Sequence, residues 1–236
     1  MKKIIKLIKI LFKPLWIKGL FYNIVATTEH EYIKNYLPKI NTLIDIGSNK
    51  GQFMIFLKYF YPHIEIYSFE PINEMIKKQK KFFKNKKKIY YFNYALGNKS
   101  DIKIFNITRR TDSSSLYKIS KNNNSNSDYD IIDKFKVKVN KLDNILTHNI
   151  KKPILTKIDV QGYELEVLKG ANKILDKIDY LFIEVSKNQI YINQAVYKEI
   201  LIFLKKKNFI EIKASNWSKI KKTNFYQKDI LFKKMS

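Results

Sequence analysis

The stretch LIDIGSNKGQF, residues 43–53, decides the fold that this sequence predicts. Its apolar start indicates a strand that ends near Gly47, and a helical segment begins after Gly51. A strand, a glycine turn and a helix in this order bring the backbone close to a ligand at the positive end of the helix. The turn is not the dinucleotide fingerprint, because three residues separate the two glycines, and it lacks the Gly-Lys-Ser/Thr of a Walker loop.

Short apolar runs alternate with lysine-rich helical segments along the rest of the chain. This alternation predicts a sheet that is mostly parallel and covered by helices on both faces. No helical segment separates the last two runs, so we expect them to close the sheet as an antiparallel pair. The runs are residues 42–47, 64–70, 89–96, 154–160, 180–186, 209–213 and 229–233.

Glu70 ends the second run and is followed by Pro71. An acid at the end of the strand next to a glycine turn can accept hydrogen bonds from both ribose hydroxyls of an adenosine. It can also cap the helix that Pro71 begins, and the two roles are compatible. The turn and the acid together predict a nucleoside-containing cofactor.

The composition indicates one globular α/β domain preceded by a helical segment. The chain has 236 residues, of which 45% are hydrophobic and 14% aromatic, enough for one substantial core. It contains no cysteine, which excludes disulfides, cysteine-ligated zinc and thiol nucleophiles. We assign residues 1–40 to a basic, helical N-terminal segment and residues 41–236 to the cofactor-binding domain.

Basic residues outnumber acidic ones by 46 to 21, so the formal net charge is +25. This charge favours anionic partners such as nucleic acid, acidic lipid headgroups and acidic glycans. Only Arg109 and Arg110 are arginines, however, and lysine is the poorer residue for reading bases or phosphates. The lysines therefore also fit a solvated surface with few specific partners.

Residues 1–24 alternate lysines with apolar residues. The lysines leave no apolar core long enough for a signal peptide or a spanning helix. Apolar residues between Ile4 and Leu11 repeat at helical spacing, which predicts a basic amphipathic helix ending near Pro14. Such a helix either lies on an anionic membrane or packs on its own domain or on a second copy of the chain. A polar helical stretch then continues to Pro38.

Residues 111–130 are rich in Ser and Asn and poor in apolar residues. This composition cannot form core, so we expect a mobile loop inserted between strands of the core. A long loop in a compact α/β domain is either a lid over the site or a surface insertion.

The chain resembles the FkbM-type S-adenosylmethionine-dependent methyltransferases over most of its length. Besides residues 43–53, the resemblance rests on YSFEP (67–71), FNYALGN (92–98), DSSSL (112–116), KIDVQGYELEVLKGA (157–171) and IEVS (183–186), which stand in the family's order and spacing. Two positions depart from the family's pattern. Ser48 stands where alanine is usual, and Gln161 stands where glutamate is frequent.

The resemblance implies a doubly wound, Rossmann-like sheet of about seven strands with a reversed last strand. It also implies that S-adenosylmethionine binds at the carboxyl ends of the strands. The cofactor-binding residues carried over from the family are Asp45, Gly47, Ser48, Asn49 and Gly51 for the methionine half, Glu70 for the ribose, and the backbone around Ala95 and Leu96 for the adenine.

Methyl transfer to oxygen needs a group that aligns the acceptor alcohol and takes its proton. Asp159, after the fourth run, is the first candidate for this base; Glu184 is the second, and His30, whose setting resembles the family, is the third. Asp159 can instead orient the cofactor's amino group or cap the turn that follows it. Glu164 and Glu166 lie in a helical segment and are expected to be surface charges. No tight ligand cluster predicts a metal ion.

The sequence therefore predicts an S-adenosylmethionine-dependent O-methyltransferase whose acceptor is a hydroxyl, best matched by a sugar of a surface glycan or its precursor. We expect a cytoplasmic protein, at the inner membrane face if residues 1–24 bind lipid, and a homo-oligomer is compatible with the sequence. Two alternatives remain, a ribose-directed RNA methyltransferase and a non-catalytic cofactor-binding scaffold at the membrane. Nucleic acid is disfavoured as the acceptor for two reasons. Asp159-Val160-Gln161-Gly162 stands where methyltransferases of amino groups carry a Pro-Pro-aromatic turn. Methyltransferases of base carbons that use a cysteine are excluded, because the chain has none.

Overall fold

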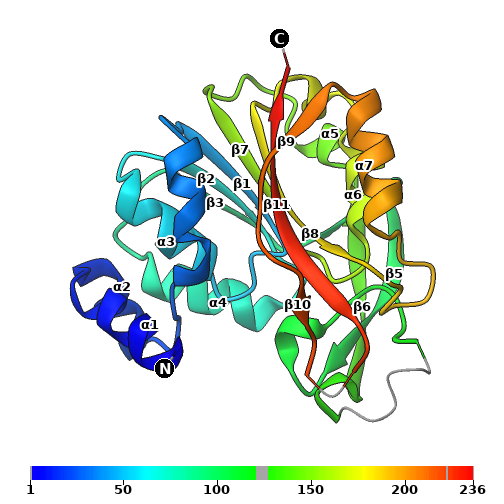
Figure 1. The fold of residues 1–236 in the computed structure, drawn as a ribbon, viewed down its shortest axis with the longest axis horizontal. Coiled ribbons are helices and arrows are strands. Elements are labelled where there is room, and N and C mark those ends of the chain that lie inside the picture. The colour runs from blue at the N-terminus through cyan, green and yellow to red at the C-terminus, as the bar shows by residue number, and fades with distance from the viewer. Residues whose placement is uncertain (1, 121–126, 222, 236) are drawn as a thin grey trace.

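The computed structural model describes residues 2–120, 127–221 and 223–235, and parallel strands form the centre of this part of the chain (Figure 1). The strands are rich in Ile, Leu and Phe, which suit a sheet buried on both faces. They follow one another across the sheet as β3 (Ile89–Phe92), β2 (Glu65–Phe69), β1 (Thr42–Ile46), β7 (Ile154–Ile158) and β8 (Tyr180–Ser186).

The last strands close the sheet in reverse, as the sequence predicts. β11 (Tyr226–Lys234) pairs antiparallel with β8 and with β9 (Phe209–Ala214), and the short β10 (Ser218–Lys219) lies along the same strand. The expected doubly wound, Rossmann-like sheet with a reversed last strand is therefore confirmed.

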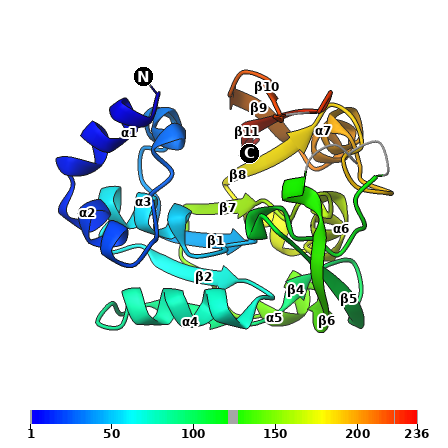
Figure 2. The same cartoon turned by 90° about the horizontal axis from the view of Figure 1, so that it is seen from below.

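Helices cover both faces of this sheet (Figure 2). Alternating side chains of one strand enter different cores, since Leu43 packs in the same cluster as α3 and Ile44 in the same cluster as α6 and α7. This alternation follows from the two-residue period of a strand. The helices of the domain are α3 (Gln52–Phe60), α4 (Asn73–Phe82), α5 (Leu142–Ile145), α6 (Glu164–Gly170) and α7 (Tyr197–Lys206).

A second, smaller sheet corrects two expectations. The apolar run 89–96 is not one strand, because it splits into β3 and β4 (Ala95–Leu96), and β4 joins β6 (Ile131–Asn140) and β5 (Asp101–Thr108). The Ser- and Asn-rich segment 111–130 connects β5 to β6, and not two strands of the main sheet; its residues 121–126 lie outside the described part of the chain. The lysines of β6 alternate with Phe and Val, so this strand was hidden in a lysine-rich segment.

The N-terminal segment forms two helices, the first of which ends near Pro14 as the sequence predicts. α1 (Lys2–Leu11) stops before Pro14, which begins α2 (Pro14–Phe21), because a proline without an amide hydrogen is tolerated in the first helical turn. Trp16 of α2 is fully buried and packs against the rings of Phe56 and Tyr59 of α3. The polar stretch that follows is the 3-10 helix η1 (Thr28–Tyr36).

Candidate functional site

A cavity of about 770 Å³ opens at the carboxyl ends of the parallel strands. The ends of β1, β2, β7 and β8 supply its floor, and η1, β4, β11 and the segment after β5 supply its walls. The sequence-predicted residues that line it are His30, Gly47, Ser48, Asn49, Glu70, Ala95, Leu96, Asp159 and Glu184. Asp45 and Gly51 are not among the lining residues.

The turn after β1 packs tightly between the neighbouring strands. Gly47 has a φ of 73°, and a β-carbon there would lie 1.9 Å from the carbonyl oxygen of Asp159. The amides of Gly47 and Ser48 both donate to the carbonyl oxygen of Phe69 at the end of β2. Only glycine fits this combination of positive φ and close backbone approach.

Glu70 caps the turn and still faces the cavity. Its carboxylate accepts hydrogen bonds from the amide of Asn49 at 2.8 Å and from the amide of Ile72 at 2.9 Å. Burial raises the pKa of Glu70 to about 7, and the two backbone amides oppose that rise. Each carboxylate oxygen has a second acceptor position, so the cap leaves room for a ligand hydroxyl.

Asn49 supports the fit of a nucleoside cofactor. Its side-chain oxygen is buried in the cavity wall and has no hydrogen-bond partner among the described residues. A buried acceptor without a partner costs free energy that a donor on a ligand can recover. Ribose hydroxyls and a ligand ammonium are donors of this kind, and Glu70 beside Asn49 accepts from the same groups.

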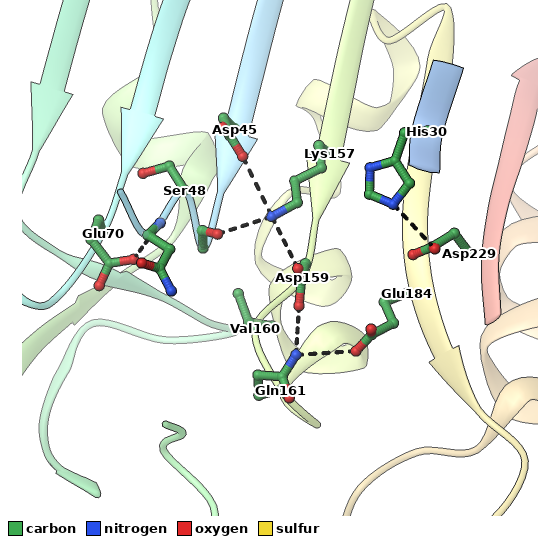
Figure 3. Close-up of polar contacts among 12 residues, drawn as sticks. His30, Asp45, Ser48, Glu70, Lys157, Asp159, Val160, Gln161, Glu184 and Asp229 are labelled. Carbon is green, nitrogen blue, oxygen red and sulfur yellow. Dashed lines mark hydrogen bonds and ion pairs between the residues drawn. The ribbon is translucent and has the colours of Figure 1, made fainter. Parts of the chain in front are cut away.

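Lys157 joins the glycine turn to Asp159 (Figure 3). Its Nζ donates to the carbonyl oxygen of Gly47 at 2.9 Å and lies 3.2 Å from Asp159 Oδ2 and 3.6 Å from Asp45 Oδ1. The pairing follows from strand register, because Asp45 of β1 stands beside Lys157 of β7. Burial alone lowers the pKa of Lys157, but the carboxylates of Asp159 and Asp45 raise it above its ordinary value.

Lys157 was not among the catalytic or cofactor-binding residues predicted for the O-methyltransferase. A charged residue inside the fully buried strand ILTKI was the available signal, because a buried charge needs a partner. The partner itself could not be read from the sequence, since Asp45 and Lys157 lie far apart along the chain.

Gln161 bridges the two carboxylates that were predicted as catalytic. Its side-chain nitrogen donates to Asp159 Oδ1 at 2.7 Å and to Glu184 Oε2 at 3.1 Å (Figure 3). Gln227 of β11 donates to the same oxygen of Glu184 at 2.7 Å. Burial raises the pKa of Glu184 well above its usual range, and the nearby charges of Asp159 and Asp229 raise it further. Gln161 therefore links the two acids at the cavity floor.

His30 reaches the cavity from η1 and pairs with a residue that sequence reasoning missed. Its Nε2 lies 3.3 Å from Oδ2 of Asp229 on β11, while its Nδ1 is buried without a hydrogen-bond partner among the described residues. The ring makes T-shaped contacts with those of Phe53 and Phe182, which stack on each other. Gln227 and Asp229 stand two positions apart in the last strand and therefore on one face of it, which was the available signal.

The described part of segment 111–130 forms one wall of the cavity. Residues 111–114 and Tyr129 line it. Tyr191 holds this wall in place, since its hydroxyl donates to the carbonyl oxygen of Ser113 at 2.8 Å. Ser115 also donates to the carbonyl oxygen of Gln161 at 2.7 Å, so the wall is attached directly to the turn after β7.

Glu164 is not a helix-surface charge. It is buried at the start of α6 and accepts hydrogen bonds from the amides of Gly162 at 2.9 Å and Val160 at 3.2 Å. A carboxylate at this position satisfies amides that the turn and the helix start leave free. Glu166 does form the expected surface pair with Lys169, at 2.7 Å. Within residues 2–120, 127–221 and 223–235, no group of His, Cys, Asp and Glu is arranged to hold a metal ion.

Known proteins resemble this chain in family and in fold. The model of the methyltransferase FkbM domain matches residues 45–211. Among solved structures, a protein of the NADB-Rossmann superfamily from Streptococcus agalactiae is 13% identical with a TM-score of 0.51, over 89% of this chain and 70% of that one.

Two further solved structures share the same fold. An rRNA methylase from Streptococcus thermophilus is 12% identical with a TM-score of 0.50, over 88% of this chain and 95% of that one. Magnesium protoporphyrin IX methyltransferase from Synechocystis PCC 6803, solved with bound SAM, is 8% identical with a TM-score of 0.50, over 86% and 74%. At these identities the likeness concerns the fold alone. No curated protein matches the chain.

Proposed function

The chain belongs to the methyltransferase FkbM family, and we propose that it transfers the methyl group of S-adenosylmethionine to a hydroxyl oxygen of a sugar, in a surface glycan or its precursor. One observation carries the proposal: a single cavity contains the acceptors Asn49 and Glu70 on one side and the carboxylate of Asp159 on the other. We also propose that the reaction takes place in the cytoplasm.

The residues at the ends of β1 and β2 would hold the cofactor. Glu70 accepts from the ribose hydroxyls, and the unpartnered oxygen of Asn49 accepts from a further donor of the cofactor. The turn at Gly47 and Ser48 brings backbone against the methionine half, and Ala95 and Leu96 border the adenine. Asp45 contributes indirectly, because it is fully buried and its nearest cation is Lys157.

Asp159 is the proposed base. When bound, S-adenosylmethionine supplies an electrophilic methyl group on its sulfonium. The side chain of Asp159 is 35% exposed, so an acceptor hydroxyl can reach it. Lys157 at one oxygen and Gln161 at the other hold the carboxylate in one orientation. The carboxylate can therefore align the hydroxyl and take its proton as the oxygen–methyl bond forms.

Glu184 and His30, the other two candidates for the base, fit this role less well. Glu184 accepts from two side-chain amides, and its raised pKa favours the protonated form, which cannot accept a proton. The free nitrogen of His30 is buried, and its other nitrogen faces Asp229. We therefore assign His30 and Glu184 to positioning, and Asp159 to proton transfer.

The cavity wall suits a polar acceptor. Hydroxyl, amide and charged side chains line it away from the predicted cofactor end, among them Asp112, Ser215, Ser218, Lys219 and Gln227. Alternating donors and acceptors of this kind recognise the hydroxyls of a sugar. The positive charge of the lysines that line the cavity would also attract an anionic glycan or a nucleotide-linked precursor.

Asp159→Asn tests the proposal, because it keeps the shape of the side chain and removes the proton acceptor. Purified protein is incubated with isotope-labelled S-adenosylmethionine and a panel of glycans and nucleotide sugars, and cofactor affinity is measured by calorimetry. We expect turnover to fall by about 10²–10⁴ with cofactor affinity nearly unchanged. Asp176→Asn, at an exposed acid paired with Lys234, is the matched control and should leave turnover unchanged.

Loss of cofactor binding in Asp159→Asn, with normal turnover at saturating cofactor, would show that Asp159 is a cofactor ligand. Transfer of the label to RNA and not to any glycan would favour the ribose-directed alternative. Tight cofactor binding with no transfer to any acceptor would favour the non-catalytic scaffold.

A further inference from the structure

Lys6 and Lys9 of α1 pair with acids of the protein's own 3-10 helix η1. Lys6 Nζ lies 2.9 Å from Glu29 Oε2, and Lys9 Nζ lies 2.7 Å from Glu31 Oε2. Lys13, which follows α1, pairs with the same Glu31 and lies over the ring of Trp16 at 3.9 Å. Lys6, Lys9 and Lys13 are thus neutralised against η1.

Ile10 of α1 is buried in the core, but the other described apolar residues of the helix face solvent. Leu7, Ile8 and Leu11 are each about half exposed, and Phe12, directly after the helix, is 80% exposed. We call these four residues the N-terminal apolar face. Soluble surfaces rarely gather large apolar side chains in this way without a partner. Phe21 at the end of α2 is 83% exposed and extends the exposed apolar surface along the helix pair.

Exposed lysines lie beside the helix pair α1 and α2. The ring of Tyr22 lies 5.3 Å from that of Phe82, and Lys18 Nζ lies 5.6 Å from the same ring. Phe82 belongs to the segment 77–88, whose lysines are exposed. In Figure 2, α1 and α2 lie at one end of the molecule and β5 and β6 at the other. Exposed apolar side chains beside exposed lysines are the pattern of a surface that binds anionic lipid.

We propose that the N-terminal apolar face docks on an anionic lipid surface, with Lys18 of α2 and the lysines of segment 77–88 contacting the headgroups. A second copy of the chain is the weaker occupant, because two molecules of net charge +25 repel each other at low screening. Docking would be peripheral, since no helix in the described part of the chain is long and apolar enough to cross a membrane.

The test compares vesicle binding by the full chain and by Leu11→Ser/Phe12→Ser. Both residues are exposed and lie outside the cavity wall, so folding and cofactor affinity should be unchanged. Co-sedimentation is measured with vesicles of phosphatidylcholine and phosphatidylglycerol in equal parts, and with phosphatidylcholine alone. Ile132→Ser/Ile202→Ser is the matched control, because both isoleucines are 57% exposed and lie on β6 and α7.

We expect the unaltered chain and the control to bind the anionic vesicles, with little binding to phosphatidylcholine alone and a decrease at high salt. Leu11→Ser/Phe12→Ser should partition at least ~10-fold more weakly, because two apolar side chains lose their burial. Equal binding by the two double variants, or no binding by the unaltered chain, would overturn the proposal. A dimer that Leu11→Ser/Phe12→Ser dissociates, without vesicle binding, would overturn it in favour of a second copy.

Discussion

Replacing Lys157 with methionine should destabilise the fold strongly, and more so at alkaline pH. The side chain of Lys157 is only 9% exposed, and its ammonium is the nearest cation to Asp45, which is fully buried. Removing one partner of a buried ion pair costs about 3–5 kcal/mol. Asp159 contributes less to this loss, because its side chain is 35% exposed and water can replace the lysine.

The pH dependence follows from Asp45. Burial already raises the pKa of Asp45 to about 6, with Lys157 opposing the rise. Without the lysine, the folded-state pKa must rise further above the unfolded value. The neutral acid is then tolerated at low pH, and stability is lost as pH rises through the folded-state pKa. The deficit should thus be small near pH ~5 and reach its full size near pH ~8.

Urea unfolding followed by tryptophan fluorescence measures this effect, with the free energy read from the midpoint and the slope. Asp45→Asn/Lys157→Met is the control, since it removes both charges and should recover most of the loss. A loss below about 1 kcal/mol for Lys157→Met at pH ~8, or an equal loss at both pH values, would refute the reasoning.

Two other predictions concern the cofactor acid and the N-terminal segment. Cofactor affinity should increase as pH rises through about 7, because the ionised form of Glu70 is the better acceptor. Glu70→Gln should flatten that pH dependence, which calorimetry across this range checks. An unchanged slope in the variant would assign the titration to another group. Trp16→Ala should lower the free energy of unfolding by about 3–5 kcal/mol, since the ring is fully buried. Phe12→Ala, at an exposed ring, should change it by less than about 0.5 kcal/mol. Similar losses in the two urea titrations would contradict the packing of α2 on α3.

The sequence alone was sufficient for the features that depend on neighbouring residues. The strand, turn and helix at residues 43–53 have local signals in their apolar period and their glycines, and the alternation of apolar and helical runs predicted the sheet. The residues proposed to hold the cofactor, Gly47 to Asn49 and Glu70, stand at strand ends, which a parallel sheet brings to one edge. Local patterns therefore located the cavity.

Local signals were weaker where lysine obscured the pattern. β6 alternates lysines with Phe and Val, and its solvent-facing lysines made the strand look like another charged segment. The helix pair α1 and α2 shows the same limit. The apolar period predicted an amphipathic helix, but which side of it faces the protein depends on Glu29 and Glu31, which are distant in sequence.

Only the tertiary structure decided how the polar residues of the site are paired. Lys157 meets Asp45 because β1 and β7 align in register, and Asp229 stands beside Glu184 because β11 runs antiparallel to β8. Glu164 is buried because the turn before α6 leaves amides that need an acceptor. Register and burial arise from packing over the whole sheet, and a one-residue shift of a strand would turn its polar side chains to the other face. Residue types along the chain do not carry that information.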